Sequence, residues 1–382
     1  METMTSNNII VISTNHHNGL GIIRSLGEAG YNVYLLVLSE RKSFITKSKY
    51  ISKYWYVKDD FEVIELLKKE FISQKFKHII FPADDISTSI IDRNVSLLEG
   101  KFIIPNINLK DNAILHKMNK LEMNKLAEDF GFLVPKSITV NLRNNHKKIE
   151  ELVYNLNIDY PIIVKPVQSI SGSKSDISIV TDNHMLTSSL TDLKKIYSEV
   201  LIQEYIDKKG ELGVQGLVTP ISKEVIIPGV IEKVRQSEFA PGSTTYAKLV
   251  KKNPLINISK IKEFIEVLGY IGVFDMEFIF TNEKVYFIEL NYRNGAYGYA
   301  FTRAGINIPL LWYYDAINKD ISVYNKDIKK EITLLNEFAD LKNVTAGNVN
   351  LFIWLIEFIR NDAYLILNKK DLKPFIYKFL YR

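Results

Sequence analysis

The sequence predicts a multidomain chain of mixed α/β and α+β class. Its 382 residues exceed what one hydrophobic core usually serves. The first forty residues alternate an apolar run, a helical pattern and a second apolar run, which is typical of a parallel βαβ unit. Residues 273–291 instead contain two adjoining strand patterns around a polar turn, which indicates an antiparallel hairpin. We therefore expect a parallel sheet near the amino terminus and an antiparallel sheet later in the chain.

Composition fits a folded protein and excludes several classes of function. Hydrophobic residues make up 46% and aromatic residues 12% of the chain, which is ample for packed cores. The net charge of +5, from 49 basic and 44 acidic residues, is too small to indicate a nucleic-acid partner. The absence of cysteine excludes disulfides and thiolate metal sites. The first residues lack the pattern of a signal peptide, and no apolar run reaches the roughly 20 residues of a membrane span, so we expect a cytoplasmic protein.

The βαβ opening consists of a strand at Ile9–Ser13, a helix at Leu20–Ala29 that Gly30 ends, and a strand at Val33–Leu38. Its Gly19-Leu20-Gly21 matches half of a dinucleotide-binding fingerprint, but the third glycine is missing. A tight strand-to-helix turn explains this pattern better.

A second strand-to-helix connection follows. Phe61–Phe71 is an amphipathic helix pattern, and His78–Phe81 is a strand that ends before Asp84 and Asp85. Acids beyond the carboxyl end of a parallel strand lie where open α/β sheets bind ligands. Either acid could equally cap the next helix, and both interpretations stay open.

The hairpin places acidic residues on one of its faces. We expect strands at Val273–Phe280 and Val285–Asn291, joined by a three-residue loop at Asn282–Lys284. This register pairs Phe280 with Tyr286, Phe278 with Ile288, Met276 with Leu290, Glu277 with Glu289, and Asp275 with Asn291. A two-residue loop would set Glu277 against Ile288 and mix the two faces, so burial of one face favours the first register.

Two carboxylates that face each other repel, and a bound cation would offset that cost. Glu277, Glu289, Asn291 and Asp275 supply only oxygen ligands, which suit Mg²⁺ with phosphate completing the shell. The alternative is a hairpin whose acidic face is simply solvated.

The strand G-x-x-x-x-E-F at residues 272–278 and the following I-E-L-N-Y-R at 288–293 resemble the metal-binding end of the ATP-grasp superfamily. The similarity is to its carboxylate-amine ligase type, including carbamoyl-phosphate synthase large-subunit-like and D-aspartate ligase-like proteins. It implies that Glu277, Glu289 and Asn291 hold two Mg²⁺ ions, or Mn²⁺, against the phosphates of ATP. It also implies that Arg293 contacts the transferred phosphoryl group. Tyr292 stands where the family usually has proline.

The same resemblance assigns further nucleotide contacts. It implies that Lys120 and Lys165 reach the phosphates, and that the loop around Ser171, Gly172 and Ser173 covers them. It also implies that adenine is surrounded by Glu204, Tyr205 and Ile206, and that Glu211 binds the ribose hydroxyls. Arg235 is the expected contact of an acyl-phosphate, with Lys233 and Lys248 as lesser anion contacts. Without the family pattern, these residues would be ordinary strand, loop and solvated helix positions.

The resemblance divides the chain into three parts. Residues 1–110 resemble a Rossmann-like pre-ATP-grasp domain, and residues 111–325 an ATP-grasp domain with a lid lobe at 120–200 and a metal-binding lobe at 201–325. Residues 326–382 form a helical extension outside the resemblance. The implied activity is ligation of a small-molecule carboxylate to an amine through an acyl-phosphate, giving ADP and phosphate. An amino acid or a cell-envelope precursor is the expected substrate. Carbamoyl-phosphate-type chemistry, or ATP binding without turnover, is the alternative.

The tail contains an apolar run at Leu351–Ile359 that is too short to span a bilayer. Because the run is apolar nearly all round, we expect it to be buried against the body of the protein. Basic residues follow among aromatic ones, at Lys369, Lys370, Lys373, Lys378 and Arg382. This cluster leaves peripheral contact with anionic lipid as the alternative.

Overall fold

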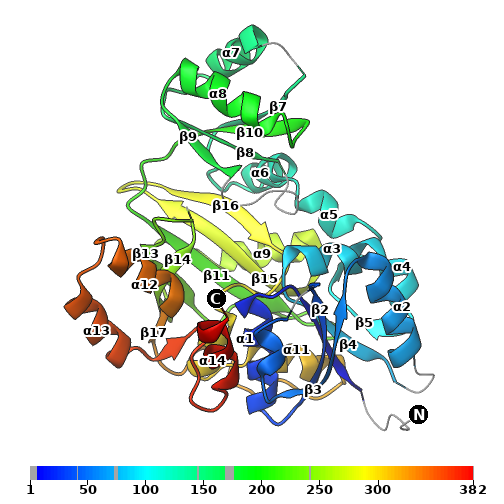
Figure 1. Ribbon diagram of the computed structural model, residues 1–382. Helices are drawn as coiled ribbons and strands as arrows, with labels where there is room; N and C mark the ends of the chain where they lie inside the picture. The colour runs from blue at the N-terminus through cyan, green and yellow to red at the C-terminus, as the bar shows by residue number, and fades with distance from the viewer. Residues whose placement is uncertain are drawn as a thin grey trace.

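The computed structural model describes residues 7–40, 42–72, 76–143, 146–167, 176–240 and 242–381. These residues form three β-sheets, as the sequence predicts for a mixed α/β and α+β chain. Figure 1 shows a lobe with α7 and α8 that projects from the rest of the molecule at the top of the view. The expected phosphate-covering loop with Ser171, Gly172 and Ser173 lies outside the described residues.

The amino-terminal sheet has five parallel strands in the order β3-β2-β1-β4-β5. The strands are β1 (Ile9–Ser13), β2 (Val33–Leu38), β3 (Ile51–Val57), β4 (His78–Pro82) and β5 (Phe102–Ile103). The connecting helices are α1 (His17–Glu28), η1 (Ile45–Lys47), α2 (Asp60–Phe71), α3 (Asp85–Arg93) and α4 (Val95–Leu98). Apolar side chains of α1 join one core and those of α2 and α3 another, so the sheet is covered on both faces.

The projecting lobe is an antiparallel sheet in the order β7-β10-β8-β9. Its strands are β7 (Ser137–Asn141), β8 (Ile162–Pro166), β9 (Ser178–Val180) and β10 (Glu199–Glu204). Helices α7 (His146–Asn155) and α8 (Asn183–Leu193) share its core. Helices α5 (Ala113–Lys117) and α6 (Lys120–Asp129) precede it in the chain.

The largest sheet has nine strands, and its main path is β16-β15-β11-β13-β14-β17-β18. Strand β12 (Val225–Ile226) pairs with β11, and β6 (Asn106–Ile107) pairs with β15. The path strands are β11 (Gly210–Val218), β13 (Val230–Gln236), β14 (Thr244–Val250), β15 (Tyr270–Phe280), β16 (Val285–Asn291), β17 (Ile332–Leu335) and β18 (Ala363–Tyr364). Helices α9 (Ile258–Leu268), α10 (Gly298–Arg303) and α11 (Ile308–Ala316) belong to the same part of the chain. Because α1 packs with α10 and α11, the parallel sheet and the large sheet share one core.

The hairpin of β15 and β16 has the predicted acid pairs, but its turn differs from the prediction. Phe280 faces Val285 and Phe278 faces Phe287, so a two-residue loop joins the strands. A bulge after Glu277 then leaves Ile288 as the extra residue and restores the pairing of Glu277 with Glu289. The three-residue loop is therefore wrong. The bulge reconciles a tight turn with burial of the apolar face.

The carboxyl-terminal extension contacts the body of the protein through several elements. It contains α12 (Glu337–Thr345), α13 (Leu351–Arg360) and α14 (Lys373–Leu380). Strand β17, which belongs to the extension, pairs in antiparallel fashion with β14 of the large sheet, and β18 pairs in parallel with β17. Asp371, between β18 and α14, forms a buried ion pair with Arg24 of α1 at 3.0 Å. The expected burial of the apolar run is wrong, because in α13 only Trp354 is buried. None of the described helices combines the length and apolarity that crossing a membrane requires.

Candidate functional site

The hairpin presents its acids on one face because its other face is buried. Met276, Phe278, Phe287 and Leu290 pack into a core under the large sheet. Side chains alternate along each strand, so the residues between them point to the opposite side. That side carries Glu277 opposite Glu289 and Asp275 opposite Asn291, as the sequence predicts.

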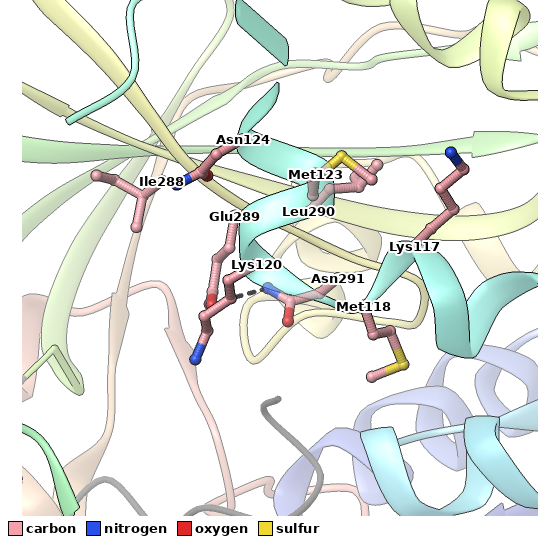
Figure 2. A pocket seen from close by; sticks show the side chains of 9 residues that line it. All are labelled: Lys117, Met118, Lys120, Met123, Asn124, Ile288, Glu289, Leu290 and Asn291. Atoms are coloured by element: carbon pink, nitrogen blue, oxygen red, sulfur yellow. Dashed lines mark hydrogen bonds between the residues drawn. The ribbon is translucent and has the colours of Figure 1, made fainter. Parts of the chain in front are cut away.

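Glu289 lies at the centre of a group of cations. Asn291 Nδ2 donates to Glu289 Oε1 at 3.3 Å, and Figure 2 shows both side chains beside Lys120 in a pocket between α6 and β16. Burial alone would raise the pKa of Glu289, but Lys120, Lys165 and Arg293 outweigh it and lower the pKa. Glu289 is therefore an ionised carboxylate in a locally positive environment.

Lys165 lies at the centre of the lid sheet and is buried. Its Nζ donates to Gln203 Oε1 at 2.8 Å across the β8 and β10 pair. Burial, with Lys120 as a second cause, lowers the pKa of Lys165 to about 7, although Glu289 acts in the opposite direction. Lys120, at the start of α6, reaches the carbonyl oxygen of Pro166 at 3.5 Å. The structure thus brings both predicted phosphate-binding lysines to the same acidic residue.

Arg293 joins the hairpin to the amino-terminal sheet. Its Nε donates to Asp85 at 2.9 Å, its Nη2 donates to Asn291 Oδ1 at 3.2 Å, and its Nη1 lies 3.9 Å from Asp275. Burial alone would lower the pKa of Arg293, but these acids raise it. The two adjacent acids have different roles, because Asp84 caps α3 through the backbone N–H of Ser87. Asp85, not Asp84, therefore contacts the predicted site.

Lys233 occupies the acidic face of the large sheet. Its Nζ lies 2.5 Å from Glu277 and 3.0 Å from Glu211, and its side chain is 2% exposed. Lys208 contacts the other oxygen of Glu211 at 2.5 Å. Burial alone would raise the pKa of Glu211, but Lys233 and Lys208 lower it to about 2. Lys233 thus supplies positive charge to Glu277 and Glu211, and its ion-pair partners in the structure are these two carboxylates.

Arg235 contacts the carboxyl-terminal extension, and its contact with an acyl-phosphate stays a prediction. Its guanidinium makes a bidentate ion pair with Asp340 of α12, at 2.8 and 2.6 Å, and contacts Glu357 of α13 at 2.7 Å. A β-bulge lies between Lys233 and Arg235, so the side chains do not alternate between the two faces of the sheet there as their spacing in the sequence implies. The described contacts of Arg235 thus tie the large sheet to the carboxyl-terminal extension. Lys248 is exposed on β14.

The expected adenine-binding segment follows β10. Glu204 ends the strand, and its carboxylate accepts the backbone N–H of Lys136 at 3.1 Å. Tyr205 is half-buried and Ile206 is buried. Contact of these residues with adenine stays a prediction.

The metal-binding prediction rests on the chemistry of the donor set. Glu277, Glu289 and Asn291 offer two carboxylates and one amide oxygen on adjacent strands. In the described ranges, no group of three or more His, Cys, Asp or Glu side chains has the arrangement of a complete metal site. Mg²⁺ is usually held by one or two carboxylates together with substrate phosphates and water, and this donor set fits that description.

Sequence reasoning missed Gln203, and it left the roles of Asp85 and Asp275 open. Gln203 supports Lys165, and Asp85 supports Arg293. Asp275 is 3% exposed, and its Oδ1 has no hydrogen-bond partner among the described residues. Burial and the neighbouring Glu277 raise the pKa of Asp275 to about 7. Gln203 lies two residues after buried Leu201 on β10, and strand alternation places both on the same face of the lid sheet.

Comparison with known proteins gives a consistent result. A family model for the ATP-grasp domain matches residues 125–304. The chain is 27% identical over 178 residues to the carbamoyl phosphate synthase large chain of Sulfolobus acidocaldarius, and 28% identical over 189 residues to the D-alanine–D-alanine ligase of Pelagibacter ubique. These matches cover 45% and 47% of this chain, but only 16% and 58% of the two relatives.

Among solved structures, the fold is similar to that of N5-carboxyaminoimidazole synthetase from Staphylococcus aureus, a structure complexed with ADP. The TM-score is 0.68 at 16% sequence identity, and the match covers 91% of this chain and 88% of that one. The likeness therefore extends over all three sheets, including the amino-terminal one that precedes the family match.

Proposed function

The chain carries an ATP-grasp domain, and on that premise we propose that it is an ATP-dependent carboxylate–amine ligase. In this reaction an oxygen of the substrate carboxylate attacks the γ-phosphorus of ATP, and the bond to ADP breaks. The nitrogen of an amine then attacks the acyl carbon, phosphate leaves and an amide forms. No covalent bond to the protein is needed, so the enzyme contributes alignment and charge neutralisation.

The observation that supports this proposal best is the set of cations around Glu289. Lys120 comes from α6, Lys165 from β8 and Arg293 from the segment just after β16, and all three act on the same carboxylate. A polyphosphate needs converging positive charge, whereas a structural carboxylate needs only one partner. Lys120 and Lys165 would hold the phosphates as compact point charges. Arg293, oriented by Asp85, would align the transferred phosphoryl group at the boundary with the amino-terminal sheet.

Glu277, Glu289 and Asn291 would hold Mg²⁺, which when bound neutralises the charge of the phosphate oxygens. Lys233 contacts Glu277 and Glu211 at once. Lys233 can therefore keep its ion pair with Glu211 when Glu277 binds a metal ion instead. Arg293 donates to the Asn291 amide oxygen and thereby fixes the orientation of that side chain.

We propose an amino acid as one substrate. The curated relative from Pelagibacter ubique is named as a ligase of D-alanine to D-alanine, and it matches almost half of this chain. A carboxylate would bind where Arg293 and Asp85 connect the two sheets, since ligands of open α/β sheets bind at the carboxyl ends of strands.

The test is phosphate release from ATP and Mg²⁺ across a panel of single and paired amino acids, with mass spectrometry of the products. We expect one set of substrates to give equal amounts of ADP, phosphate and an amide. Phosphate release that requires bicarbonate would indicate carbamoyl-phosphate-type chemistry instead. ATP binding without phosphate release under any substrate would indicate a module without turnover.

A further inference from the structure

Helix α13 exposes an unusual amount of apolar side chain. Six large apolar residues of this ten-residue helix are between 38% and 78% exposed: Leu351, Phe352, Ile353, Leu355, Ile356 and Ile359. Only Trp354 is buried, at 7% exposed. Contiguous apolar surface of this kind is rare on soluble proteins unless another surface covers it.

The exposed side chains follow one another around the helix. At about 100° per residue, Leu351, Leu355, Ile359, Phe352 and Ile356 occupy neighbouring directions in that order. Buried Trp354 contacts the ring of Phe358 in a tilted arrangement, with 5.1 Å between the ring centroids, on the side that faces the protein. Figure 1 shows α13 at the outer edge of the molecule, beside α12 and away from the amino-terminal sheet. The apolar face therefore points outward as one continuous strip.

The fully exposed charges between residues 337 and 360 are cationic. From residue 337 to residue 360 the acids are Glu337, Asp340 and Glu357. The first two are buried, and Asp340 and Glu357 are both paired with Arg235. The exposed charges of the same segment are Lys342 and Arg360, and neither forms an ion pair with any described residue.

The chain that follows continues the pattern. Lys369, Lys370 and Lys373 are exposed and lack an ion pair within the described ranges. The one acid between them, Asp371, is buried with Arg24. Helix α14 adds exposed Phe379 and further apolar side chains. The exposed acid that follows α13, Asp362, pairs with Lys330 at 3.2 Å. Helix α13 is therefore flanked by apolar side chains and by cations that form no ion pair within the described ranges.

We propose that α13 binds the surface of an anionic lipid bilayer, with its apolar strip inserted among the lipids and the flanking cations on the headgroups. Apolar insertion together with lysine and arginine near the surface is the combination that holds interfacial helices. A second copy of the chain fits less well, because a symmetric contact would bring the same unpaired cations together. Protein interfaces are also depleted in lysine.

The experiment is flotation of the full chain with vesicles of phosphatidylcholine alone or of equal parts phosphatidylcholine and phosphatidylglycerol, at low and high salt. We expect binding to the anionic vesicles only, and weaker binding at high salt. The double substitution Phe352→Ser with Ile359→Ser should reduce binding at least tenfold without lowering the melting temperature, since both side chains are exposed. Arg360→Gln should reduce it roughly fivefold.

The matched control is Phe61→Ser with Val267→Ser, which removes side chains 72% and 68% exposed on α2 and α9. This control should bind vesicles like the wild type. Equal vesicle binding by the α13 variant and the wild type would overturn the proposal, as would a wild type that binds no vesicles. A wild-type dimer in analytical ultracentrifugation that the α13 variant loses, with no vesicle binding, would assign the strip to a second copy instead.

Discussion

The affinity of this protein for ATP should fall as the pH rises through 7, and Lys165 should be the cause. Buried Lys165 has a pKa of about 7, well below its ordinary value of 10.5. Phosphate oxygens favour the ammonium form, so ATP should bind the protonated protein and raise that pKa. Adenosine lacks the phosphates, and its affinity should not depend on Lys165.

The magnitude follows from the fraction of protonated lysine. With a pKa of about 7, roughly nine-tenths of free Lys165 is protonated at pH 6 and roughly one-tenth at pH 8. If only the protonated form binds the phosphates, the apparent affinity for ATP falls by about tenfold across this range.

The effect of Lys165 on folding has the opposite sign. Its pKa is lower in the folded protein than in the unfolded chain. Between pH 7 and 10.5 the unfolded chain therefore binds a proton that the folded protein lacks. The contribution of Lys165 to the free energy of unfolding should rise with pH in this window, while ATP affinity falls.

The assay is isothermal titration calorimetry with ATP and with adenosine at pH 6, 7 and 8, in two buffers of different ionisation enthalpy. The buffer difference reports proton uptake, which should be largest for ATP near pH 8. Lys165→Met should weaken ATP binding far more than adenosine binding and should remove the proton uptake. Since titration of ATP itself is common to both proteins, it cancels in their ratio. The reasoning fails if the ratio of wild-type to Lys165→Met affinity for ATP is constant between pH 6 and 8, or if the substitution weakens both ligands equally.

Three further outcomes are expected. Glu289→Gln should nearly abolish ATP-dependent product formation without unfolding the protein, because it removes the charge of one metal ligand and keeps the shape of the side chain. The control Glu283→Gln, in the exposed hairpin turn, should leave product formation unchanged. Wild-type turnover by Glu289→Gln would exclude Glu289 from the site. Asp371→Asn should lower the free energy of unfolding by about 3 kcal/mol in chemical denaturation, because it leaves Arg24 charged and fully buried, whereas an unchanged midpoint would contradict this role. Truncation before Asn350 should lower the melting temperature, because it removes β18 from the sheet and the partner of Arg24 together; an unchanged melting curve would show that the extension does not stabilise the body.

The sequence by itself determined the elements whose signal is local. The strand bounds predicted at Ile9–Ser13, Val33–Leu38 and Val285–Asn291 are the observed ones. Side-chain alternation within one strand depends only on the strand, and burial of one face selects the register. For this reason the pairing of Glu277 with Glu289 was predictable, even though the turn was not.

The tertiary structure decided the features that depend on distant parts of the chain. Arg293 meets Asp85, 208 positions away, and Arg235 meets Asp340, 105 positions away. Sequence spacing contains no information about these contacts, because they depend on how the sheets pack together. The same reason explains α13. An apolar pattern shows that burial of a helix lowers the free energy of the protein. Only the tertiary structure shows whether the protein itself offers a surface that covers the helix.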